Sequence, residues 1–76
     1  MKPEQTQTIS VELSDRENEV LSLLMKCFSN QQIASELRIS EKTVEKHLTN
    51  IYAKAGVSSR TEAVLWGMSQ GRDIPT

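Results

Sequence analysis

Residues 29–55 of this chain read SNQQIASELRISEKTVEKHLTNIYAKA and contain two helix patterns that stand three residues apart. Each pattern follows a serine, which is a preferred N-cap because its hydroxyl accepts a hydrogen bond from the first turn of a helix. Apolar residues then recur at steps of three and four, the spacing that places them on one face of a helix. The stretch therefore predicts a short helix near residues 30–37 and a longer helix near residues 41–55.

Two further helices are predicted on either side of this stretch. Capping boxes, in which a serine and an acid or amide three residues later bond to each other's backbone, are predicted at Ser14, Ser29 and Ser59. Apolar residues at helical spacing follow each start, and no strand-like alternation competes. Helices are therefore predicted near residues 14–26 and 60–70 as well, so the expected fold class is all-α, a four-helix bundle.

The chain is expected to form one domain over residues 13–72. Residues 1–12 are mostly polar and read as a flexible arm or the end of a linker, and residues 73–76 read as a tail. Gly56 and Gly71 follow the last two helices, where a left-handed residue commonly ends a helix.

Length and composition exclude most other classes of protein. A chain of 76 residues with 37% hydrophobic residues can bury one small core and leaves no enclosed active site. No run approaches the ~20 apolar residues of a membrane span, and no stretch resembles a signal peptide. One cysteine forms neither an internal disulfide nor a zinc site. We therefore expect a cytoplasmic protein with no enzyme activity, cofactor, metal or membrane contact.

Charge is segregated along the chain although the net charge is only −1. Residues 1–37 carry three basic and six acidic side chains, whereas residues 38–60 carry five basic and two acidic ones. A chance asymmetry of solvated faces would give the same pattern. The positive segment nevertheless coincides with the longer central helix, which makes that helix the place to look for an anionic partner.

The two central helices and the turn between them have the order of a helix-turn-helix. The longer helix carries a narrow apolar stripe formed by Val44, Leu48, Ile51 and Ala55. Its opposite face is polar and free, and such a face fits the major groove of DNA, which is about 12 Å wide. Because capped helical pairs also occur in bundles that bind no DNA, the pattern by itself favours DNA binding without establishing it.

The chain also resembles the DNA-binding output domain of LuxR-type bacterial transcription regulators, also called the NarL/FixJ type. The segments that carry this resemblance are LSDRENEVLSLL, SNQQIASELRISEKTVEKHLTNIYAKAGV and SSRTEAV, and it extends from about Leu13 to Gly71. It implies a helix-turn-helix at about residues 30–49, a third helix that reads the major groove, and a fourth helix that pairs two copies on a two-fold DNA site. The implied partners are double-stranded DNA and a second copy of the chain, with RNA polymerase as a further candidate.

The resemblance also implies roles for individual residues. Contacts to base edges are expected from Lys42, Glu45, Lys46 and Thr49. Contacts to the phosphate backbone are expected from Ser29, Asn30, Gln31, Thr43, His47, Asn50 and Lys54. The expected dimer interface is an outer edge of the fourth helix formed by Thr61, Leu65 and Met68.

These assignments have competing structural interpretations. His47 would otherwise be an exposed helical histidine, Lys54 and Arg60 would be solvated surface charges, and Met68 would be a packing residue. For the whole domain, one rival is the promoter-reading domain of a sigma factor, which would bind core RNA polymerase without self-pairing. The other is a protein-interaction module that kept the fold and lost DNA binding, which the acidic Glu45 and the overall charge would suit.

Three residues depart from the family pattern. Glu45 stands where a basic or polar residue is frequent, and we expect it to raise selectivity rather than affinity by accepting from a cytosine amine. Cys27 replaces the glycine that usually ends the first helix, so either the turn differs or stability falls by roughly 1 kcal/mol. We expect Cys27 to be a small semi-buried residue rather than a redox switch. Gly67 replaces the usual alanine, and we expect it to permit close helix approach across a dimer seam.

Overall fold

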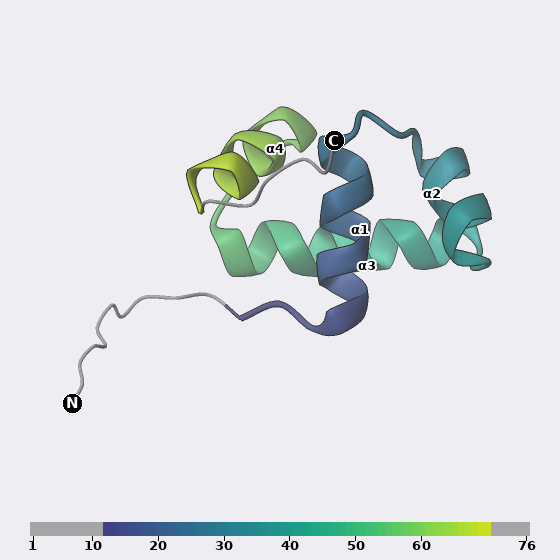
Figure 1. The fold of residues 1–76 in the computed structure, drawn as a ribbon. Coiled ribbons are helices and arrows are strands. Elements are labelled where there is room, and N and C mark those ends of the chain that lie inside the picture. The colour runs from purple at the N-terminus through teal and green to yellow at the C-terminus, as the bar shows by residue number, and fades with distance from the viewer. Residues whose placement is uncertain (1–11, 71–76) are drawn as a thin grey trace.

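The structure, a computed structural model, describes residues 12–70 as an all-α domain. Its helices are α1 (Asp15–Met25), α2 (Asn30–Leu37), α3 (Glu41–Ala55) and α4 (Arg60–Ser69). Figure 1 shows α1 crossing in front of α3, with α2 and α4 on opposite sides of α1. The predicted fold class and all four predicted helices are confirmed, each end within one residue of its expected position. The predicted arm (except Glu12), the predicted tail 73–76 and the predicted cap at Gly71 lie outside the described residues.

The helix starts follow the predicted serine caps, with one exception in detail. Both hydrogen bonds of the capping box are present at Ser14 and at Ser29. At the start of α4, the Ser59 hydroxyl accepts from the Glu62 amide at 3.1 Å, but the Glu62 carboxylate accepts from the Ser58 amide at 2.7 Å. The prediction of a third capping box is therefore wrong in its second hydrogen bond, because the Glu62 carboxylate accepts from the amide of the residue before the N-cap and not from the N-cap amide.

The hydrophobic core lies where α1 and α3 cross and is closed by α2 and α4. Its fully buried large side chains are Leu21, Leu24, Ile33, Ile51, Val20 and Val44. Helix α3 contributes Val44, Leu48 and Ile51 to this core, as predicted, whereas Ala55 is only half-buried. The buried stripe of α3 is therefore one residue shorter than predicted, and the rest of the helix surface stays open.

Two turns are closed by residues that are not glycine. Cys27, between α1 and α2, has φ 68°, and Arg38, at the end of α2, has φ 60°. The turn after α1 thus keeps its left-handed geometry without glycine, at a cost of roughly 1 kcal/mol. The Cys27 side chain is exposed, so the prediction that it is semi-buried is wrong. Gly56 has φ 72° and ends α3 as predicted.

Gly67 permits a close helix approach, but between α4 and α1 of the same chain. A Cβ atom at Gly67 would lie 2.8 Å from Sδ of Met25 and 3.5 Å from Cδ2 of Leu21. The glycine is buried, and both neighbours belong to α1. The prediction that Gly67 serves a dimer seam is therefore wrong, because the absence of a side chain at Gly67 allows α4 to pack closely against α1.

Candidate DNA-binding interface

The four predicted base-contacting residues lie together on the exposed face of α3. They line, with Thr43, a shallow surface hollow of about 370 Å³ formed by Lys42, Thr43, Glu45, Lys46 and Thr49. The opposite face of α3 is held in the core, so this helix presents its polar side without having to move. A rigid helix that carries hydrogen-bond donors, hydrogen-bond acceptors and charges of both signs has the chemistry needed to read base edges in a major groove.

Within this hollow, the hydroxyl of Thr49 is already bonded to the helix. Thr49 Oγ1 donates to the backbone carbonyl of Glu45 at 3.0 Å. Its proton is therefore engaged, and what remains for a partner is the oxygen's acceptor capacity and the methyl group. These fit a base amine and a thymine methyl, respectively.

Asn30, one of the residues predicted to contact phosphate at the start of α2, is hydrogen-bonded by a side chain of α4. Arg60 donates through Nη1 to Oδ1 of Asn30 at 2.7 Å and through Nη2 to the carbonyl of Phe28 at 2.6 Å. Because a guanidinium only donates, the carbonyl end of the Asn30 amide faces Arg60 and the NH₂ end faces elsewhere. The interpretation of Arg60 as a solvated surface charge is therefore wrong. No local pattern pointed to this role.

The predicted phosphate contacts on α3 differ in how free their side chains are. Asn50 is exposed, whereas Thr43 is half-buried, with its hydroxyl 2.9 Å from Oγ of Ser40. His47 is half-buried too, so the interpretation as an exposed helical histidine is wrong, and its Nδ1 is buried with no hydrogen-bond partner in the described part of the chain. This leaves Nε2 as the ring nitrogen for a contact outside the fold.

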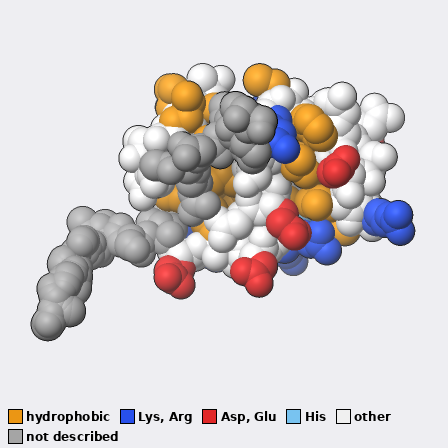
Figure 2. Space-filling view, viewed as in Figure 1, with side chains coloured by type: hydrophobic (Ala, Val, Ile, Leu, Met, Phe, Trp, Pro, Cys, Tyr) orange, Lys and Arg blue, Asp and Glu red, His pale blue; other side chains and the backbone are white. Residues whose placement is uncertain are grey.

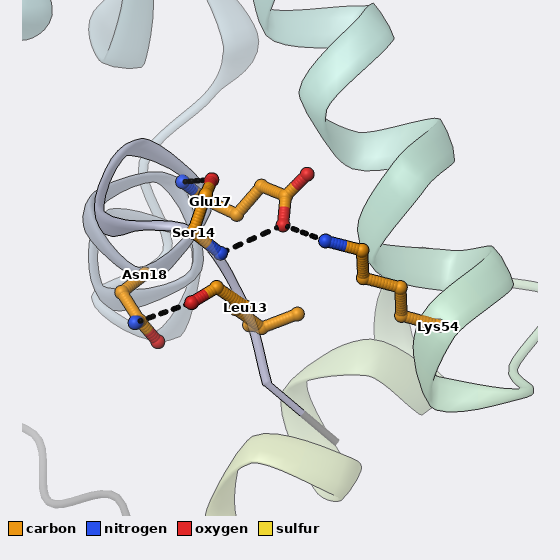
Figure 3. Close-up of polar contacts among 5 residues, drawn as sticks. All are labelled: Leu13, Ser14, Glu17, Asn18 and Lys54. Atoms are coloured by element: carbon orange, nitrogen blue, oxygen red, sulfur yellow. Dashed lines mark hydrogen bonds and ion pairs between the residues drawn. The ribbon is translucent and has the colours of Figure 1, made fainter.

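Lys54 forms an ion pair with Glu17 of α1. Its Nζ lies 2.7 Å from Oε1 of Glu17, whose side chain is only 7% exposed, and the same oxygen accepts from the backbone amide of Ser14 at 3.0 Å (Figure 3). The hydrogen bond from Lys54, followed by that from Ser14, lowers the pKa of Glu17 below its ordinary value of 4.5 although burial opposes this. Lys54 is therefore not a simple solvated charge, and any phosphate contact has to share its ammonium group with Glu17.

The predicted dimer edge of α4 is open to solvent. Leu65 is 59% exposed and Met68 52% exposed, and Thr61 is exposed beside them. The other side of α4 buries Ala63 and Gly67 in the fold. The interpretation of Met68 as a packing residue is therefore wrong within a single copy of the chain.

The surface of the domain carries charges of both signs. The face seen in Figure 2 carries acidic and basic side chains among exposed hydrophobic ones, so it is not uniformly basic. Between residues 12 and 70, no three His, Cys, Asp or Glu side chains are grouped in a way that could hold a metal ion. No helix in that range has both the length and the hydropathy needed to cross a bilayer.

Solved structures of known regulators share this fold. The transcription factor GerE superposes with a TM-score of 0.75 at 39% identity, covering 83% of this chain and 96% of GerE. VqmA of Vibrio cholerae, described as a dimer in a study of LuxR-type receptors, superposes with a TM-score of 0.80 at 33% identity, over 83% of this chain and 28% of VqmA.

The sequence matches point to the same group. The response regulator protein VraR of Staphylococcus aureus (strain Mu3) is 48% identical over 54 residues, which are 71% of this chain and 26% of VraR. The chain thus spans about a quarter of the length of the curated relatives it matches. The family model described as "Bacterial regulatory proteins, luxR family" matches residues 11–67. This chain therefore belongs to the luxR family of bacterial regulatory proteins, which are transcription regulators and not an enzyme class, and it has the fold of their helix-turn-helix DNA-binding domain.

Proposed function

We propose that this domain is a sequence-specific DNA-binding regulator of transcription that places α3 in the major groove. The observation that carries the proposal is the gathering of Lys42, Glu45, Lys46 and Thr49 on the one face of α3 that the core leaves free. The other face of the helix is anchored by fully buried side chains, so α3 can enter a groove about 12 Å wide as a rigid body. Such a regulator acts on the bacterial chromosome, in the cytoplasm.

Phosphate contacts would supply most of the affinity in this proposal. The start of α2, Ser29 to Gln31, and the α3 residues Thr43, His47, Asn50 and Lys54 are the proposed backbone contacts. The α2 start adds the partial positive charge of a helix N-terminus, which favours an anion. If the cationic side chains around these contacts neutralise about eight phosphates in two domains together, the logarithm of the binding constant falls with the logarithm of the salt concentration at a slope near −7.

The proposal includes a homodimer on a two-fold related DNA site, paired through α4. Its support is the exposed edge of Thr61, Leu65 and Met68, in which two large apolar side chains are more than half exposed. Among the similar structures, VqmA is described as a dimer. A Leu65→Asp variant should remain folded, bind a single half-site as the parent does, and lose the cooperative gain on a site with two half-sites. Equal cooperativity in both proteins would exclude pairing through this edge.

The proposed base contacts are tested by charge-matched variants. A binding site is first selected from a pool of random duplexes, and fluorescence anisotropy then compares Lys46→Gln with Arg16→Gln. Both variants remove one positive charge, but Arg16 lies on α1 in an exposed ion pair with Glu19. The Lys46 variant should lose about 1–3 kcal/mol of binding free energy, and the Arg16 variant much less. Equal losses would contradict the proposed face, and an intact fold that binds no duplex would favour a protein-interaction module.

A further inference from the structure

We infer that Arg60 is a positioning residue for the DNA backbone contact at the start of α2. It orients the side-chain amide of Asn30 so that the NH₂ group is presented outward to a phosphate. This inference rests on the proposed DNA-binding function. It is carried by the two hydrogen bonds that the Arg60 guanidinium donates, 2.7 Å to Asn30 and 2.6 Å to the carbonyl of Phe28.

These two bonds join the start of α4 to the turn before α2 and to the first residue of α2. Over residues 12–70, α2 packs on α1 and α3, and α4 packs on α1 and α3, but α2 and α4 make no close backbone approach to each other. Figure 1 shows the two helices on opposite sides of α1. Arg60, the first residue of α4, spans this gap to a residue 30 positions earlier in the chain. The start of α2 is thereby fixed relative to α4.

The turn before α2 borders an open space on the side that faces α4. An open hollow of about 530 Å³ lies between the turn and the start of α4, and Cys27, Ser29, Asn30 and Arg60 are among its lining residues. The turn also contains Cys27 in left-handed geometry, which is unfavourable for a residue other than glycine. Backbone bonds to α1 and the partly buried Phe28 hold the inner side of the turn, and the two hydrogen bonds of Arg60 hold it across this open space.

The orientation of Asn30 follows from the chemistry of its partner. Arg60 occupies the acceptor end of the amide, and over residues 12–70 the NH₂ end has no hydrogen-bond acceptor. Asparagine NH₂ groups are common donors to phosphate oxygens, and such contacts set the position of a protein on the duplex. Without Arg60 the amide would be free to rotate and expose either end, so only part of the population would be ready to donate.

Positioning and direct contact predict different salt dependences. Asn30 is neutral, so losing its contact weakens binding without changing the number of counterions released. An arginine that itself neutralises a phosphate would instead change the slope of log K against log salt by about 0.9 for each domain. The two roles can therefore be separated in one series of titrations.

The test compares Arg60→Gln, Arg60→Lys, Asn30→Ala and the double variant Asn30→Ala/Arg60→Gln, with Arg16→Gln as the charge control. Anisotropy titrations with a selected duplex at several salt concentrations give affinity and slope, and thermal unfolding shows that each variant is folded. Both Arg60 variants should bind about tenfold more weakly, the loss expected for one hydrogen bond to a charged group. Their slope should match the parent's, and Arg60→Gln should add less than about twofold in the Asn30→Ala background, as expected for two residues acting through one contact.

The alternatives each give a distinct result. Parent-like affinity in Arg60→Gln or in Arg60→Lys, a changed slope in Arg60→Gln, or a full additional loss in the double variant would overturn the inference. If Arg60→Gln does not fold, Arg60→Lys carries the same comparison, because one ammonium cannot reproduce both bonds of the guanidinium fork. If the unmodified protein binds no DNA, the proposed function itself is wrong. If the unmodified protein binds DNA and an Arg60 variant binds equally well, only the inference about Arg60 is wrong.

Discussion

Replacing Lys54 with methionine tests the ion pair that joins α3 to α1. The chain offers two ion pairs of different burial for comparison. Arg16 and Glu19 lie on one helix, 3.0 Å apart, with side chains 43% and 55% exposed, whereas Lys54 and Glu17 are 2.7 Å apart and the Glu17 side chain is only 7% exposed. An exposed pair of the first kind stabilises a fold by about 0.3–0.5 kcal/mol.

The second pair should contribute more because its carboxylate is buried. Without Lys54, Glu17 keeps its bond to the Ser14 amide but loses a charged donor at the same oxygen. Leaving a buried polar group short of a partner costs about 1–3 kcal/mol, and a charged group costs more. Methionine keeps most of the length and apolar contact of the lysine stem. We therefore expect Lys54→Met to lower the free energy of unfolding by about 1–3 kcal/mol.

Urea unfolding at neutral pH without DNA measures this effect separately from any phosphate contact. Arg16→Met is the matched control, with an expected loss below about 0.5 kcal/mol. The double variant Glu17→Met/Lys54→Met should recover part of the loss, because it removes the buried charge together with its partner. Equal losses in Lys54→Met and Arg16→Met would show that the α1–α3 pair contributes no more than an exposed ion pair despite the burial of the Glu17 carboxylate.

Three further predictions concern acid stability, helix packing and base selection. The fold lowers the pKa of Glu17 below 4.5, so the stability that its carboxylate contributes is present above that pH and is lost as the pH falls through the lower folded value. The free energy of unfolding should therefore fall less steeply with acid in Glu17→Gln than in the unmodified protein. Equal steepness would contradict this role of Glu17. Gly67→Ala gains about 1 kcal/mol of helix propensity, but its new methyl group forces a shift of the buried Met25 side chain that costs about 1–3 kcal/mol. Urea unfolding should therefore show a lower free energy of unfolding in this variant. A clearly higher value would be the contrary result. Glu45→Ala should bind DNA more tightly but discriminate less among sequences in a selection experiment; unchanged discrimination would end the assignment of a selectivity role to Glu45.

The local part of the fold could be predicted from the sequence because its causes are local. A serine cap and apolar residues at helical spacing act within a few positions of each other, and all four helices followed from them. The free face of α3 followed as well, since Val44, Leu48 and Ile51 decide which side of the helix is buried. The predicted base-contacting residues therefore lie together in the structure.

The contacts between distant side chains could not be predicted in this way. Arg60 reaches Asn30 over 30 positions and Lys54 reaches Glu17 over 37, and neither pair has a sequence pattern that selects the partner. Helical periodicity fixes which face of a helix is buried but not which helix lies against it. For that reason the sequence predicts a close helix approach at Gly67 without identifying α1 as the helix that makes it.

A backbone amide NMR titration with duplex DNA shows whether α3 and the start of α2 form the DNA-reading face. With a mixed-sequence duplex at low salt, we predict shifts confined to residues 29–31 and 42–54 that weaken as salt is raised, as phosphate contacts require. The amides of the α1 face, away from these segments, should stay in place and serve as the internal control. An intact fold with no shifts in 29–31 and 42–54, or with shifts only along α4, would exclude this face as the DNA-binding surface.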